Sequence, residues 1–180
     1  DHGTYPFVTS SNTTIGGAYS GGGVYLEFEK RIGIVKAYTT RVGAGPFPTE
    51  LKDEVGEKLR EKGREFGATT GRPRRCGWLD LHLLKRSCIT NGFNYIVLTK
   101  LDCLNGFETL KVSVDYDDKN QPVYEDLPGW EEDIVGTTDY DKLPANCQNY
   151  IQFIEDFMNM KIGLISTGPD RKDVIFQEKL

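Results

Sequence analysis

The stretch that decides the fold is Tyr95–Asp102, YIVLTKLD, in which a run of strand-forming residues leads directly into a short polar segment. Residues 95–99 form a continuous apolar run, which is typical of a central strand in a parallel sheet that is buried on both faces. In open α/β sheets, ligands bind at the carboxyl ends of the strands. We therefore predict that residues 99–102, TKLD, lie at the ligand-binding edge of a central parallel strand.

Helix and strand patterns alternate on both sides of this run. Strands are expected at residues 33–38, 95–99, 110–116, 122–125 and 162–165, and helices at residues 50–62, 78–90 and 144–159. Thr49 is placed to cap the first helix, residues 39–50 otherwise read as a loop, and residues 1–23 read as a loop with short helical turns. The alternation predicts an α/β fold with a mostly parallel central sheet, flanking helices and an antiparallel ribbon over residues 110–125, with residues 1–180 as a single domain portion.

Composition sets limits on the class of protein. The chain has 180 residues, a net charge of −5 and a hydrophobic content of 38%, which describe an ordinary soluble protein. No apolar run approaches the roughly 20 residues of a membrane span. The four cysteines form no CxxC pair and only two histidines are present, so we expect no zinc site and reduced thiols in a cytosolic enzyme.

Residues 65–80, EFGATTGRPRRCGWLD, form the stretch that points most directly to chemistry. Small and hydroxyl residues (67–71) lead into Arg72, Arg74 and Arg75, whose guanidinium groups bind carboxylates and phosphates in a bidentate way. The pattern predicts capture of a small anionic substrate. The alternative is that the loop binds no substrate and that its arginines are solvated or pair with nearby acidic residues. A nucleic-acid site is disfavoured by the net charge of −5 and by the lack of a wider basic stripe.

The TKLD segment has a chemistry of its own. An aspartate at the end of a strand can accept hydrogen bonds from N1–H and the exocyclic amine of guanine, a donor pair that adenine lacks. Lys100 can lay its stem over the purine, and [NT]KxD after a hydrophobic strand is the guanine signature of many GTP-binding proteins. Residues 166–169, STGP, follow another apolar strand and can close over the same base through their backbone. A solvated strand edge and a plain turn remain the alternatives.

The sequence contains no GxxxxGK[ST] phosphate loop. A GTP-using enzyme needs a phosphate cradle, a magnesium ligand and a group that handles protons. The chain supplies a candidate guanine-binding segment and an arginine loop that can bind an anion, but no phosphate cradle. We therefore interpret it as part of an active site.

Together these residues resemble the C-terminal portion of the adenylosuccinate synthetase family over nearly the whole chain. The resemblance rests on blocks in the same order, which are GTYPFVTSSNTT (3–14), KAYTTRVGAGPFPTE (36–50), REFGATTGRPRRCGWLD (64–80), LTKLD (98–102), LPGW (127–130), LPANCQNYI (143–151) and ISTGPDR (165–171). It implies a P-loop GTPase-like fold, a cytoplasmic location and a homodimer, with no nucleic-acid or membrane partner.

The resemblance also implies the reaction, in which GTP, IMP and L-aspartate give adenylosuccinate, GDP and phosphate in AMP biosynthesis. In the family, an aspartate removes the N1 proton of IMP, O6 attacks the γ-phosphate with help from a histidine, and the amine of L-aspartate displaces phosphate from 6-phosphoryl-IMP. That aspartate, that histidine, the phosphate loop and the Mg²⁺ ligands belong to the family's N-terminal half. We therefore expect no catalytic residue and no metal ligand here, and no activity from this segment alone.

The resemblance assigns binding roles residue by residue. IMP would be bound by Thr9, Val42 and Arg72, and L-aspartate by Ala68, Thr69, Thr70, Gly71, Arg72, Pro73 and Arg74. GTP would be bound by Arg74, Lys100, Leu101, Asp102, Ser166, Thr167 and Gly168.

Two departures stand out. Residues 21–25 replace a longer connection that is usual in the family, and the stretch after Tyr116 is short. We expect the chain to be a partial or gapped form of a longer enzyme. A non-catalytic guanine-nucleotide-binding module is the alternative function, since it would share LTKLD but would not use the arginine loop.

Overall fold

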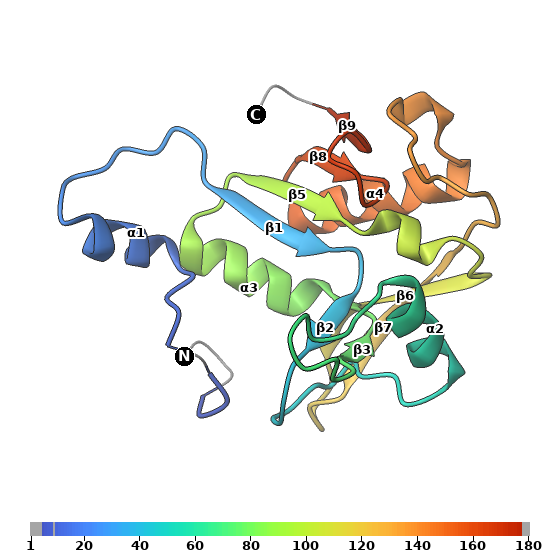
Figure 1. The fold of residues 1–180 in the computed structure, drawn as a ribbon, viewed down its shortest axis with the longest axis horizontal. Coiled ribbons are helices and arrows are strands. Elements are labelled where there is room, and N and C mark those ends of the chain that lie inside the picture. The colour runs from blue at the N-terminus through green and yellow to red at the C-terminus, as the bar shows by residue number, and fades with distance from the viewer. Residues whose placement is uncertain (1–4, 9, 178–180) are drawn as a thin grey trace.

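The computed structural model describes residues 5–8 and 10–177 (Figure 1). The helices are α1 (Ile15–Gly22), α2 (Glu54–Lys62), α3 (Leu81–Asn91) and α4 (Ala145–Met158), with 3₁₀ turns η1 (Leu101–Leu104) and η2 (Tyr140–Lys142). The strands are β1 (Ile32–Lys36), β2 (Thr39–Arg41), β3 (Arg75–Gly77), β4 (Leu79–Asp80), β5 (Tyr95–Thr99), β6 (Thr109–Tyr116), β7 (Pro122–Pro128), β8 (Ile162–Ser166) and β9 (Val174–Phe176).

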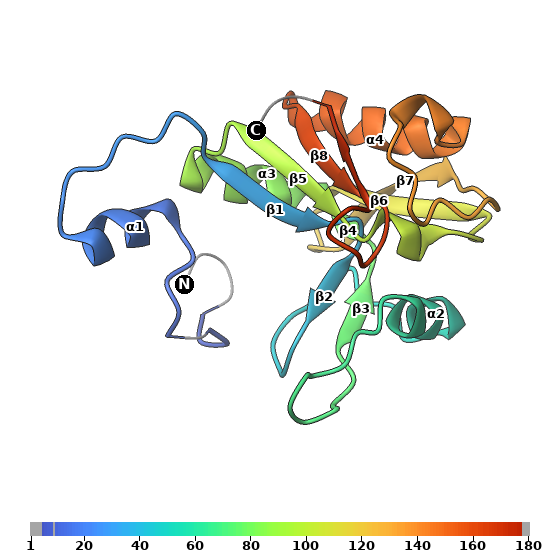
Figure 2. The same ribbon diagram turned by 45° about the horizontal axis from the view of Figure 1, so that its top comes forward.

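The central sheet has the strand order β1-β5-β8-β9. β5 pairs in parallel with both β1 and β8, while β9 pairs with β8 in the antiparallel sense. Helices α3 and α4 contact each other and lie on one face of this sheet (Figures 1 and 2). The prediction of an α/β fold with a mostly parallel central sheet and flanking helices is confirmed, with YIVLT as an inner strand.

Two smaller sheets complete the structure. β6 and β7 form the expected antiparallel ribbon, and β4 extends it as a parallel neighbour of β6. β2 and β3 form a separate antiparallel pair in which Thr40 lies opposite Cys76. The prediction of a loop throughout residues 39–50 was therefore wrong at its start, because Thr39–Arg41 find a ladder partner far along the chain.

Two helices begin later than predicted. α2 begins at Glu54 because the Asp53 side chain caps it by accepting a hydrogen bond from Gly56 N at 3.1 Å. Thr49 is instead buried, and its carbonyl accepts a hydrogen bond from Trp78 N at 3.2 Å. α3 begins at Leu81, where Asp80 acts as the cap, so the residues just before it extend as β4 instead of opening the helix.

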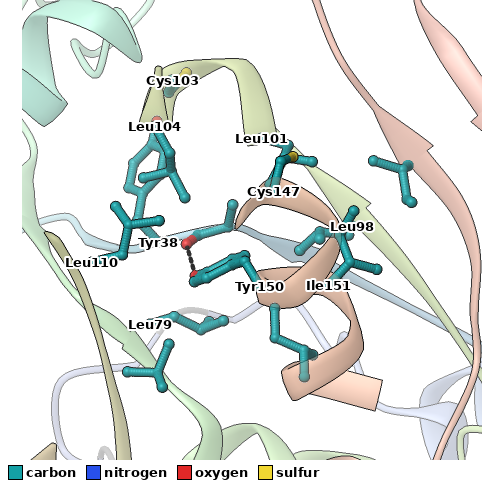
Figure 3. Packing of buried hydrophobic residues seen from close by; sticks show 14 of the residues in the cluster. Tyr38, Leu79, Leu98, Leu101, Cys103, Leu104, Leu110, Cys147, Tyr150 and Ile151 are labelled. Atoms are coloured by element: carbon teal, nitrogen blue, oxygen red, sulfur yellow. Dashed lines mark hydrogen bonds between the residues drawn. The ribbon is translucent and has the colours of Figure 1, made fainter. Parts of the chain in front are cut away.

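The core lies between α4, the central sheet and η1 and continues to β4 and β6. Tyr150 of α4 is buried, and its hydroxyl donates a hydrogen bond to Ala37 O at 2.8 Å, while Leu98, Leu101 and Ile151 pack around it (Figure 3). The four cysteines are buried and unbridged. No helix among the described residues is long and apolar enough to cross a bilayer.

Replacing a core residue of α4 tests this packing. Ile151 is fully buried, so Ile151→Ala should lower the free energy of unfolding by about 2–5 kcal/mol through lost burial and cavity formation. Asn149→Ala, an exposed change on the same helix, should stay within about 0.5 kcal/mol of the starting protein. Denaturant titration compares the two, and equal effects would contradict the assigned orientation of α4.

Candidate functional site

The loops predicted to bind ligands leave the central sheet at one edge. In the parallel ladder, Lys36 of β1 lies opposite Thr99 of β5, and Leu98 lies opposite Ile165 of β8. The segments that follow these three strands therefore start side by side. This confirms the predicted place of TKLD beyond the carboxyl end of a central parallel strand.

The arginine loop is a closed turn with an exposed tip. A bridge between Phe66 and Pro73 closes its base, and Gly67 N donates a hydrogen bond to Arg72 O at 2.9 Å. Gly71 takes a positive φ of 63°, which glycine adopts without strain. Thr69 and its neighbours at the tip, residues 68–72, are exposed, so their hydroxyl and guanidinium groups face outward.

The three arginines of this stretch have different surroundings. The Arg72 guanidinium is exposed and has no hydrogen-bond or ion-pair partner among residues 5–8 and 10–177. Arg75 is fully engaged, because Nε and Nη2 donate to Glu50 at 2.7 Å each and Nη1 donates to backbone carbonyls, and the pair lowers the pKa of the Glu50 carboxyl. Arg74 lies between these extremes, because Nη1 contacts Glu65 Oε2 at 2.7 Å while its buried Nε has no partner in the described chain.

Glu65 joins the arginine loop to the sheet edge. Its side chain is 0% exposed, and Oε1 accepts hydrogen bonds from Lys36 Nζ and Tyr38 OH, each at 2.6 Å. Lys100 Nζ lies 4.0 Å from the same oxygen. Burial raises the pKa of the Glu65 carboxyl, but hydrogen bonds from Lys36, Tyr38 and Arg74 outweigh burial and hold the pKa below its ordinary value.

The TKLD segment turns sharply at Lys100. Its backbone is left-handed, with φ at 60°, and its Nζ donates a hydrogen bond to Gly63 O at 2.7 Å. Leu101 is fully buried, so only its backbone is left to meet a ligand. Asp102 is half-buried within η1.

The pKa of the Asp102 carboxyl is raised above its ordinary value. Burial raises its pKa, and the negative charges of Asp133 and Asp173 raise it further. A backbone hydrogen bond and the Lys100 ammonium oppose these effects without cancelling them. A ligand that brings hydrogen-bond donors to the carboxyl would favour its ionised form and lower this pKa.

The segment after β8 meets the same edge. Thr167 is buried, and its hydroxyl donates a hydrogen bond to Thr137 O at 2.7 Å, so its side chain is already engaged. Ser166 Oγ donates a hydrogen bond to Gly168 O at 3.0 Å. Because both hydroxyls are engaged, a ligand here would meet mainly the backbone of residues 166–168, and the expected contact with guanine stays a prediction.

The two remaining IMP candidates differ in what the structure says of them. Thr9 lies outside the described residues. Val42 is 76% exposed and follows β2 directly. Because Arg41 pairs with Arg75, Val42 and the arginine loop extend from the same end of the β2–β3 ribbon (Figure 2).

Comparison with known proteins decides the family. Residues 1–175 match the family model described as adenylosuccinate synthetase. The chain belongs to the adenylosuccinate synthetase family. The resemblance drawn from its sequence blocks is thereby confirmed.

Named relatives agree. The adenylosuccinate synthetase of Thermodesulfovibrio yellowstonii is 52% identical over 195 residues, which cover 99% of this chain and 46% of the relative. That of Salinibacter ruber is 53% identical over 192 residues, which cover 97% of this chain and 44% of the relative. The chain thus spans less than half the length of these curated adenylosuccinate synthetases.

Solved structures support the fold. The fully ligated adenylosuccinate synthetase from Plasmodium falciparum superposes with a TM-score of 0.92 at 42% identity, covering 97% of this chain and 46% of that one. The succinoaminodeoxyadenylate synthetase of cyanophage S-2L, bound to dGMP and to dATP as an energy donor, has a TM-score of 0.58 at 16% identity over 99% of this chain and 43% of that one. This second likeness concerns the fold alone.

Sequence reasoning did not identify the buried polar residues behind the exposed loops. Glu65, Lys36 and Tyr38 stand in quoted blocks without a role of their own. A lysine at the end of an apolar strand and a glutamate directly before a glycine-rich loop were the available signals. Within the described parts of the chain, no group of three or more histidine, cysteine, aspartate or glutamate side chains is placed to hold a metal ion.

The raised pKa of Asp102 can be measured directly. Titration of its side-chain carboxyl carbon by NMR should give a pKa above the ordinary value of 3.8. Asp133→Asn should lower that pKa, because removing a nearby negative charge favours the ionised form. Asp126→Asn, on the exposed ribbon beside Lys111, should leave it unchanged. A pKa for Asp102 at or below 3.8 would contradict the described environment.

Proposed function

We propose that this chain is the part of an adenylosuccinate synthetase that binds L-aspartate and the guanine base of GTP. The observation that carries the proposal is the family match over residues 1–175, which takes in both the arginine loop and the TKLD segment. The convergence of these segments at one sheet edge supports it.

The guanine site is assigned to the segments that follow β5 and β8. Asp102 accepts hydrogen bonds from N1–H and the exocyclic amine, and the stem of Lys100, held against Gly63 O, lies beneath the base. Leu101 and residues Ser166, Thr167 and Gly168 contribute backbone. Because only the ionised carboxylate accepts both hydrogen bonds, guanine affinity is full above the raised pKa of Asp102 and falls as the pH drops through it.

The L-aspartate site is assigned to the arginine loop. Thr70 and Arg72 hold the two carboxylates of the substrate, with the other residues of the loop, Ala68, Thr69, Gly71, Pro73 and Arg74, around them. The Arg72 guanidinium, exposed and without a partner among the residues that the structure describes, suits this bidentate role and also reaches the IMP ribose. Thr9 and Val42 complete the IMP contacts, and Arg74 contacts either L-aspartate or GTP.

The complete enzyme would join IMP to L-aspartate through 6-phosphoryl-IMP and release GDP and phosphate. Mg²⁺ would assist the phosphoryl transfer, and its ligands are proposed, from the family resemblance, to belong to the N-terminal half of the complete enzyme. This segment alone is then inactive. The enzyme is further proposed to be a cytoplasmic homodimer without nucleic-acid or membrane partners.

The test is adenylosuccinate formation from IMP, GTP and L-aspartate by the complete protein that carries this chain, with its intact mass recorded. Adenylosuccinate and GDP in equal amounts would support the proposal. GDP binding that is indifferent to L-aspartate, with no product, would favour the non-catalytic guanine-nucleotide-binding module instead.

Two variants separate the assigned sites in the same assay. Losing one charge-assisted bidentate contact costs on the order of 2–4 kcal/mol, or about 30- to 1,000-fold in affinity. Asp102→Asn should therefore raise KM for GTP by that factor and leave KM for L-aspartate nearly unchanged. Arg72→Leu should do the reverse. Equal effects of both variants on both substrates would contradict the assignment.

A further inference from the structure

Glu65 is a buried charged residue, and none of the proposed substrate contacts involves it. Its side chain is 0% exposed, and a carboxylate in such a place is tolerated only when cations and hydrogen-bond donors surround it. The residues that surround it here come from segments far apart in the sequence. Its role is therefore a question about how those segments are held together.

The contacts of Glu65 divide between two sides. On the sheet side, Oε1 accepts hydrogen bonds from Lys36 Nζ and Tyr38 OH at 2.6 Å, and Lys100 Nζ lies 4.0 Å away. On the loop side, Oε2 accepts a hydrogen bond from Arg74 Nη1 at 2.7 Å. One carboxylate thus binds Arg74 of the arginine loop and lies close to Lys100, the residue at which the TKLD segment turns.

The backbone strengthens the hold on Arg74. Arg74 N donates a hydrogen bond to Glu65 O at 2.8 Å, so Arg74 is tied to Glu65 by both its main chain and its side chain. Its Nε is buried and has no partner among residues 5–8 and 10–177. The guanidinium is thereby fixed through Nη1, while the Arg74 side chain stays 32% exposed.

Positive charges outnumber negative ones next to Glu65. Lys36, Arg74 and Lys100 all lie within 4.0 Å of its carboxylate, and Lys100 also acts on the Asp102 carboxyl. The neighbouring pair contrasts with this arrangement. Arg75 donates to Glu50 from Nε and Nη2 at 2.7 Å each, and its Nη1 donates to backbone carbonyls, so every nitrogen of its guanidinium is engaged.

We propose that Glu65 is a positioning residue that sets the Arg74 guanidinium and the Lys100 ammonium from a single anchor, so that the aspartate loop and the guanine pocket are aligned together. This inference rests on the proposed function. Without the Glu65 charge, Arg74 would lose its fixed orientation and Lys100 would lose an attraction that draws it toward Gly63 O.

The test compares Glu65→Gln with Glu50→Gln in the complete protein that carries this chain. The glutamine keeps the size of the side chain but removes its charge. KM for L-aspartate should rise about tenfold, the effect of one charge-assisted hydrogen bond, and KM for GTP should rise in the same direction by a smaller factor. KM for IMP should change less than about twofold, because neither Val42 nor Arg72 contacts Glu65.

Glu50→Gln is the matched control, since it breaks a glutamate–arginine pair at Arg75, which follows Arg74 directly and begins β3. It should lower the melting temperature and leave all three KM values in place. If Glu65→Gln does not yield folded protein, Glu65→Asp keeps the charge but withdraws the carboxylate by about one C–C bond length. It should then raise KM for L-aspartate more than KM for IMP.

The possible results separate the two proposals. An active starting protein whose Glu65 variant keeps all KM values overturns the positioning role and leaves the proposed function intact. A uniform rise of all three KM values, or the same pattern in Glu50→Gln, also overturns it, because that result describes a structural ion pair only. An inactive starting protein overturns both proposals.

Discussion

The buried carboxylate of Glu65 is the constraint around which the candidate site is arranged. It lies at the start of the arginine loop. The end of β1, the far end of the loop at Arg74 and the turn after β5 each supply it with a donor or a cation. A buried ion pair is seldom worth more than well-packed apolar side chains. Its value here is directional, because a charge fixes the orientation of a guanidinium group that an apolar contact would leave free.

The arginine loop shows how local structure divides labour among residues of one kind. Arg75 is paired with Glu50 and stabilises the base of β3. Arg74 donates a hydrogen bond to Glu65 through one nitrogen of its guanidinium, and Arg72 is exposed at the tip. Moving outward along the loop, each arginine is less bound to the protein and more available to a ligand. The sequence RPRR alone does not display this gradient.

Part of the fold could be predicted because its signals are local. The apolar run of β5, the alternation of β6 and the apolar face of α4 each follow from neighbouring residues. Other features depend on distant partners and left no such signal. β2 exists because Thr39–Arg41 pair with Arg75–Gly77, and the start of α2 is moved to Glu54 because residues 49–50 are drawn into contact with Gly77 and Trp78.

The same division holds for the site. The TKLD segment was placed correctly because a strand end followed by a polar motif is a local pattern. The engagement of Thr167 with Thr137 O and the burial of Glu65 were missed, because both are set by segments that come together only in the folded chain. Blocks shared with a family carried the functional reading further than any single motif did.

The most direct test is a crystal structure of the complete protein with GDP, IMP and an L-aspartate analogue. The account predicts guanine on the Asp102 carboxylate, the analogue within the arginine loop, and Glu65 still in contact with Arg74 between them. Guanine bound away from Asp102, or Arg74 released from Glu65 when the ligands bind, would contradict it.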